Sequence, residues 1–104
     1  MLKLTIAEAV GQLTLENIDY MRLLEKDSFD MGMYRPSRVD PQTPHARDEL
    51  YIVAAGSGDF VCGSETRNFA PGDVFFVPAG TEHRFMKFSY DFATWVVFFG
   101  QSSK

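Results

Sequence analysis

The chain has 104 residues, of which 45% are hydrophobic and 23% charged, and its formal net charge is −4. This composition predicts one folded domain and excludes a disordered chain. The basic residues are scattered, whereas a nucleic-acid-binding surface needs a cationic stripe, and apolar runs such as Trp95–Phe99 are too short to cross a membrane. Cys62 is the one cysteine, and no apolar signal-peptide stretch follows Lys3. We therefore expect a cytoplasmic protein with neither nucleic acid nor a membrane as partner.

The first third of the chain predicts a helix followed by a strand. Apolar residues recur with helical spacing over Ile6–Leu13, although Gly11 weakens the pattern. The stretch Leu15–Lys26 fits either a continuation of the helix or an early strand. Phe29–Tyr34 is typical of a strand. Residues 36–44 contain three prolines, which predict a loop or an irregular edge strand.

Turn residues divide the rest of the chain into short, regularly spaced segments. Gly63-Ser64 predicts a hairpin, and Ala70–Asp73 has Pro and Gly at the central positions of a type II turn. Such punctuation, together with ten Phe, four Tyr and one Trp, is typical of an antiparallel sandwich or barrel. The predicted strands are Glu49–Ala55, Asp59–Cys62, Thr66–Phe69, Val74–Val77 (expected to be buried), His83–Phe88 and Phe92–Phe99.

Both histidines of the chain lie beside these turns. His45 precedes the strand that begins at Glu49, and His83 follows the turn Pro78-Ala79-Gly80. Here the sequence resembles the cupin family, whose two motifs are G-x5-H-x-H-x3-E-x6-G and G-x5-P-x-G-x2-H-x3-N. The matched positions are His45, Glu49 and Gly56 in the first motif and Gly72, Pro78, Gly80 and His83 in the second.

The resemblance covers roughly residues 34–100 and implies a fold. That fold is all-β, an antiparallel cupin-type β-barrel (a double-stranded β-helix or jelly roll) with a short helical N-terminal segment. We expect residues 1–33 to pack on the outside of the barrel and residues 34–104 to form it. The two parts together make one domain.

Three positions depart from the motifs. Ser37 stands where the family has the leading glycine, and Lys87 where it has the closing asparagine. Thr43 stands where the family has the first metal-ligand histidine, and it offers at most a weak hydroxyl.

The resemblance implies that His45, Glu49 and His83 bind a divalent metal ion inside the barrel. Two imidazoles and one carboxylate form the facial triad of non-haem iron sites, and three protein ligands plus water describe catalytic zinc. Manganese and nickel fit the same ligands. Gln42 and Asp48 flank the matched residues, and either can add an oxygen ligand if the proline before His45 distorts the chain.

Structural interpretations of these residues compete with the metal site. His45 and His83 are also compatible with neutral imidazoles bonded to the backbone. Glu49 is also compatible with a surface ion pair to Arg47 or Arg84.

Strand alternation bears on the direction of two side chains. It places Glu49 on the inward face that it shares with Tyr51. The same alternation puts Lys87 on the face of Phe85 and His83. Lys87 is therefore expected to point into the barrel near a substrate carboxylate, or to extend to the barrel mouth.

The fold alone does not select a function, because cupins include dioxygenases, isomerases, lyases, sugar-binding proteins and storage proteins. We expect a metal-binding cupin that binds, or acts on, a small polar molecule. Whether it is an enzyme, which residues would be catalytic, and what its ligand is stay open. The alternatives are a non-catalytic ligand-binding or sensing module and a structural dimer. We also expect a homodimer, because the many Phe residues exceed what one small barrel hides.

Overall fold

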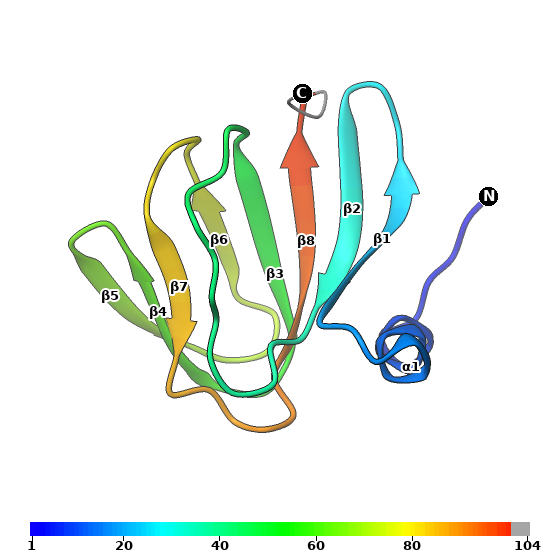
Figure 1. Cartoon of the computed structure of the whole chain (residues 1–104), viewed down its shortest axis with the longest axis horizontal. Helices are drawn as coiled ribbons and strands as arrows, with labels where there is room; N and C mark the ends of the chain where they lie inside the picture. The colour runs from blue at the N-terminus through cyan, green and yellow to red at the C-terminus, as the bar shows by residue number, and fades with distance from the viewer. Residues whose placement is uncertain (101–104) are drawn as a thin grey trace.

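Two antiparallel sheets face each other across an aromatic core in the computed structural model, which describes residues 1–100 (Figure 1). The larger sheet has the strand order β1-β2-β8-β3-β6, and the smaller one has the order β5-β4-β7. Helix α1 spans Ile6–Glu16. The strands are β1 (Tyr20–Glu25), β2 (Phe29–Tyr34), β3 (Glu49–Ala55), β4 (Gly58–Cys62), β5 (Glu65–Phe69), β6 (Val74–Val77), β7 (His83–Met86) and β8 (Ala93–Phe99).

The core lies between the two sheets because alternate side chains of each strand point inward. Tyr51 of β3 packs edge-on against Phe85 of β7, with ring centroids 4.8 Å apart, and Phe85 also packs on Phe60 and Phe92. All four side chains are buried. The aromatic composition therefore fills a β-barrel, as the sequence predicted.

Helix α1 packs on the outer face of the larger sheet. Thr5 and Glu8 form a capping box at its start, and Asn17 ends it in the left-handed conformation (φ 54°). Its buried residues Ala9 and Leu13 share a second, smaller apolar cluster with strand residues such as Met33. The ambiguous stretch 15–26 thus divides into the end of the helix and strand β1. No helix within residues 1–100 is long and apolar enough to span a membrane.

Most predicted elements are confirmed. Strands β2 and β3 have the predicted bounds, the hairpin joins β4 to β5, and residues 36–44 form no helix or strand. In the predicted type II turn, the amide of Asp73 donates to the carbonyl of Ala70 (3.1 Å) and Gly72 has a φ of 92°.

Two predictions about side-chain direction are wrong. Strand β6, which lies at the edge of the larger sheet, is buried on one face only: Val77 is buried, whereas Val74 is 57% exposed and Phe76 is 55% exposed. Lys87 does not share the inward face of His83, because β7 ends at Met86. Lys87 is exposed and has left-handed backbone geometry (φ 52°), so alternation no longer applies to it.

The N-terminal third contributes to the barrel wall as well as to its outside. Helix α1 lies outside, whereas β1 and β2 are hydrogen-bonded strands of the larger sheet, with Met33 opposite Trp95 of β8. The expected division at residue 34 therefore falls at the last residue of β2 and not between two parts. The predicted C-terminal limit, residue 104, lies outside the described residues.

Candidate metal centre

The three predicted ligands come from one loop and two facing strands. Glu49 is the first residue of β3 in the larger sheet, and His83 is the first residue of β7 in the smaller sheet. His45 lies in the loop before β3, and the carbonyl of that residue accepts a hydrogen bond from the amide of Gly80 (2.7 Å). The turn that precedes β7 thus holds the loop that carries His45.

The structure brings these three side chains together at the core. The Nε2 atom of His83 lies 3.0 Å from Oε1 of Glu49, and Nε2 of His45 lies 3.7 Å from the same oxygen. One ligand atom from each residue lies within 4.8 Å of the others. Glu49 and His83 are buried, whereas the side chain of His45 is 32% exposed.

The hydrogen bonds of His83 determine which of its nitrogens faces Glu49. Its Nδ1 lies 2.8 Å from the carbonyl oxygen of Thr81, which only accepts, so Nδ1 carries the proton in the neutral ring. The Nε2 atom of the neutral ring then carries a lone pair. This nitrogen lies 3.0 Å from Oε1 of Glu49 and 3.0 Å from the hydroxyl oxygen of Tyr51. Such an outward bond from a ligand histidine fixes the ring orientation in metal sites.

Glu49 is a buried carboxylate without a hydrogen-bond donor. Within residues 1–100, neither of its oxygens accepts a hydrogen bond, and the side chain is 1% exposed. A buried charge in this state is costly unless a cation neutralises it. The neutral Nε2 of His83 and the Glu49 oxygen repel each other until a proton or a metal ion lies between them.

The pKa of His83 also indicates that the site favours a positive charge. Burial by itself lowers this pKa, but the hydrogen bond that the protonated ring makes to Glu49 and the bond to Thr81 outweigh burial. The net effect is a pKa above the usual value of histidine. The site therefore attracts a cation when His83 is deprotonated.

Of the two flanking oxygen donors, Gln42 faces the site and Asp48 does not. The Oε1 atom of Gln42 lies 3.1 Å from Nε2 of His45 and accepts a hydrogen bond from the hydroxyl of Tyr51 (2.8 Å). Asp48 is exposed, and its Oδ1 accepts from the amide of Ala79 (2.8 Å).

The remaining predicted neighbours of the site lie apart from it. Thr43, at the position of the lost histidine ligand, is exposed. Arg47 pairs with Asp30 (3.3 Å) and Arg84 is exposed, so the surface ion pair considered for Glu49 is not formed.

Sequence reasoning missed two residues of the site. Tyr51 was placed on the inward face, but its contacts with His83 and Gln42 were not predicted. Asp40, which binds Gln42, was not predicted to take part at all. Strand alternation offered a signal for Tyr51, two residues after Glu49. Nothing in the local pattern distinguishes Asp40 from a solvated loop residue.

A cavity of about 270 Å³ connects the site with the surface. His45 and Glu49 form part of its wall, so a bound ion would face the cavity. The residues that line it are Tyr20, Tyr34, Gln42, His45, Glu49, Val96 and Phe98.

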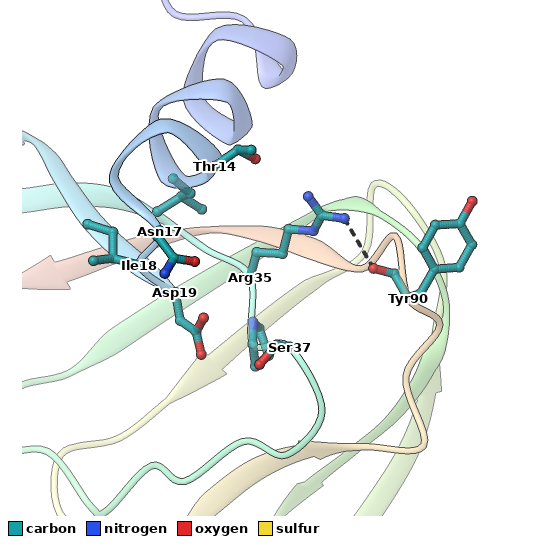
Figure 2. A pocket seen from close by; sticks show the side chains of 9 residues that line it. Thr14, Asn17, Ile18, Asp19, Arg35, Ser37 and Tyr90 are labelled. Atoms are coloured by element: carbon teal, nitrogen blue, oxygen red, sulfur yellow. Dashed lines mark hydrogen bonds between the residues drawn. The ribbon is translucent and has the colours of Figure 1, made fainter.

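A second cavity, of about 320 Å³, is lined by other residues, near the end of α1 (Figure 2). In its wall Arg35 donates a hydrogen bond to the carbonyl of Tyr90 (3.3 Å). It shares no residue with the metal centre.

The donor set fits a divalent ion. Ligand atoms about 2.0–2.2 Å from one metal ion are roughly 3.0 Å apart in octahedral and 3.4 Å apart in tetrahedral coordination. The observed separations of 3.0 Å (His83 to Glu49) and 3.7 Å (His45 to Glu49) bracket these values, and the ligand nitrogens of His45 and His83 lie within 4.8 Å of each other. The unpartnered carboxylate of Glu49 supplies the negative charge that such an ion needs.

Known proteins resemble the chain in sequence and in fold. Residues 31–97 match the family model of the cupin domain. The uncharacterized protein SCO3923 of Streptomyces coelicolor is 38% identical over 81 residues, which cover 76% of this chain and 77% of that protein.

Solved structures show the same architecture. The lyase DddQ from Ruegeria pomeroyi, described as acting on DMSP, superposes with a TM-score of 0.69 and 26% identity over 82% of this chain and 48% of its own. KdgF from a Halomonas species gives a TM-score of 0.70 and 20% identity over 81% of this chain and 79% of its own. An RmlC-like cupin with a double-stranded β-helix fold, from Methanocaldococcus jannaschii, gives a TM-score of 0.67 at 14% identity over 78% of each chain. With its barrel, its two motifs and the family match over residues 31–97, the chain belongs to the cupin family.

Proposed function

We propose that this protein binds one divalent metal ion through His45, Glu49 and His83 and presents it to a small polar molecule in the adjoining cavity. The observation that carries the proposal is the 3.0 Å approach of the His83 Nε2 lone pair to the Glu49 carboxylate, both buried. A metal ion such as iron, zinc, manganese or nickel satisfies both groups at once.

Bound in this position, the ion supplies Lewis acidity to an oxygen atom of the ligand. The protein residues hold the ligand and limit water. Val96 and Phe98 give the cavity apolar walls, and His45 forms the part of the metal site nearest to solvent. Burial and the nearby Asp30 carboxylate raise the pKa of Tyr20 to about 12, so its phenol stays protonated and can donate a hydrogen bond to the ligand.

An enclosed metal site with a purely structural role fits this geometry less well. A structural site encloses its ion with protein ligands, whereas a catalytic or ligand-binding site leaves one side open. Here the cavity reaches both His45 and Glu49. The resemblance to DddQ supports lyase chemistry as one of the reactions to be tested, and ligand binding without turnover is the alternative.

Metal analysis of the purified protein tests the proposal. We expect about one ion per chain in the wild type, loss of the ion in His83→Ala, and retention in Thr43→Ala, whose exposed side chain serves as the control. Circular dichroism verifies that each variant is folded. Equal metal content in the wild type and His83→Ala would overturn the proposed site. Thermal-shift screening of small carboxylates and hydroxylated molecules, with and without metal, then identifies the ligand class, and turnover assays separate an enzyme from a binding module.

A further inference from the structure

We infer that Gln42 is a fourth metal ligand, which replaces the histidine that the cupin motif places at position 43, and that Asp40 positions it. This inference rests on the proposed metal site. It changes the donor set from three nitrogens and one oxygen to two nitrogens and two oxygens. The loop places the side chain of residue 43 in solvent and that of residue 42 at the site.

The orientation of the Gln42 amide follows from its partners. Its Nε2 donates to Oδ2 of Asp40 (2.7 Å), and a carboxylate only accepts hydrogen bonds. Its Oε1 therefore points the other way, to the hydroxyl of Tyr51 (2.8 Å) and to Nε2 of His45 (3.1 Å). The partners of Nε2 and the partners of Oε1 therefore indicate the same amide orientation, in which the oxygen faces the metal site.

Asp40 is held rigidly enough to fix this orientation. It is 1% exposed, and its two oxygens accept from the hydroxyl of Tyr34 (2.6 Å) and the backbone amides of Phe85 (2.8 Å) and Gln42 (3.2 Å). The bond to Phe85 ties the loop to β7, two residues after His83. Asp40 thus connects the Gln42 side chain to the strand that carries a metal ligand.

Tyr51 leaves the oxygen of Gln42 free to accept a second partner. The hydroxyl of Tyr51 is a hydrogen-bond donor to the Oε1 atom of Gln42 (2.8 Å). Its single proton is directed to Gln42 Oε1, which has a second lone pair. That lone pair is the one available to a metal ion beside His45.

The donor set predicts a metal preference. Carbonyl and carboxylate oxygens suit manganese, whereas imidazole suits zinc, copper and nickel. Exchange of one imidazole for an amide oxygen should therefore shift the affinity ratio towards Mn²⁺ and away from Zn²⁺.

Calorimetric titration of the metal-free protein with Mn²⁺ and with Zn²⁺ tests the inference. We expect Gln42→Leu to weaken Mn²⁺ binding at least tenfold, and Gln42→His to raise the Zn²⁺ to Mn²⁺ affinity ratio at least tenfold. Thr43→His, which restores the motif in sequence but lies in solvent, should leave the ratio unchanged. A Thr43→His variant that behaves like Gln42→His, or a Gln42→Leu variant that binds like the wild type, would overturn the inference while leaving the proposed metal site intact.

A double-mutant comparison tests the positioning role of Asp40. In Asp40→Asn, the amide nitrogen of the new side chain can donate to Oε1 of Gln42. This bond favours the reversed orientation of the Gln42 amide, in which its nitrogen faces the metal site, and the variant should therefore bind Mn²⁺ as weakly as Gln42→Leu does. The double variant should bind no more weakly than Gln42→Leu alone, because both changes remove the same contact. Additive losses would show that Asp40 acts only on the fold. Wild-type protein that binds no metal would overturn the proposed function itself.

Discussion

The Nε2 atom of His83 lies 3.0 Å from Oε1 of Glu49, and both side chains are 1% exposed. Thr81 keeps the proton of the neutral imidazole on the opposite nitrogen. The pair therefore needs either a proton or a metal ion between its two atoms. Metal binding and protonation of His83 therefore compete. This competition determines how metal affinity and stability respond to a change of either residue or of the pH.

Glu49→Gln should weaken metal binding more than any other conservative change at the site. The amide keeps the shape of the side chain but removes the negative charge that neutralises a divalent ion. We expect a loss of at least tenfold in affinity for Mn²⁺ or Zn²⁺, measured by calorimetric titration. Asp48→Asn, on the exposed carboxylate before it, is the matched control and should bind as the wild type does. Equal affinities in the two variants would show that Glu49 is not a ligand.

The stability of the metal-free protein should decrease as the pH rises from about 6.5, the usual pKa of histidine. The folded protein raises the pKa of His83, so protonation stabilises the fold below the unfolded pKa, and this contribution is lost as the pH passes the folded pKa. Saturating metal should reverse the trend over the same interval, because the ion displaces the proton.

Thermal unfolding across this pH range, in chelator and in excess metal, measures both slopes. His83→Gln should abolish the dependence on pH in both conditions. Metal-free stability that is constant or rises over this interval would contradict the competition between proton and metal.

Two of the three motif glycines with positive φ form a matched pair for mutation. Gly56 (φ 86°) and Gly72 (φ 92°) have the same backbone requirement. A Cβ at Gly56 would lie 2.6 Å from the Cα of Phe92, whereas a Cβ at Gly72 would have no neighbour within 4 Å. Gly72→Ala should therefore cost only the backbone strain, about 1–2 kcal/mol, and Gly56→Ala clearly more. Chemical denaturation measures the free energy of unfolding of both variants. Equal losses would mean that the backbone at Phe92 moves away from the added Cβ at no cost in stability.

The resemblance to the cupin motifs, together with strand alternation, predicted that the side chains of His45, Glu49 and His83 meet. Glu49 lies at an inward position of a strand whose bounds were predicted, and His83 follows a turn marked by proline and glycine. Both signals are local, so they can be recognised in a single sequence.

The positions of Gln42, Lys87 and Val74 depend on information that no local pattern carries. Gln42 reaches the site because Asp40, in a loop without periodicity, bonds to β7. Lys87 leaves the inward face through one left-handed residue. Val74 is exposed on a strand at the edge of the larger sheet, and that edge position is a property of the strand order.

Tyr51→Phe should separate the contribution of the site's hydrogen bonds from that of its metal ligands. The Tyr51 hydroxyl is buried, donates to Gln42 Oε1 (2.8 Å) and lies 3.0 Å from His83 Nε2. Its removal leaves the ring packing in place, so we expect a loss of about 1–2 kcal/mol in the free energy of unfolding. Tyr90→Phe, which removes a hydroxyl at an 89% exposed position, should change stability by less than about 0.5 kcal/mol.

The same variant should bind metal with an affinity within about tenfold of the wild type, which is the lower end of the effect of groups that only orient ligands. Urea denaturation with and without Mn²⁺ measures both quantities on one sample, since bound metal stabilises the folded state according to its affinity. If Tyr51→Phe abolished metal binding while the fold remained stable, the phenol oxygen would have to be counted among the ligands, together with His45, Glu49 and His83.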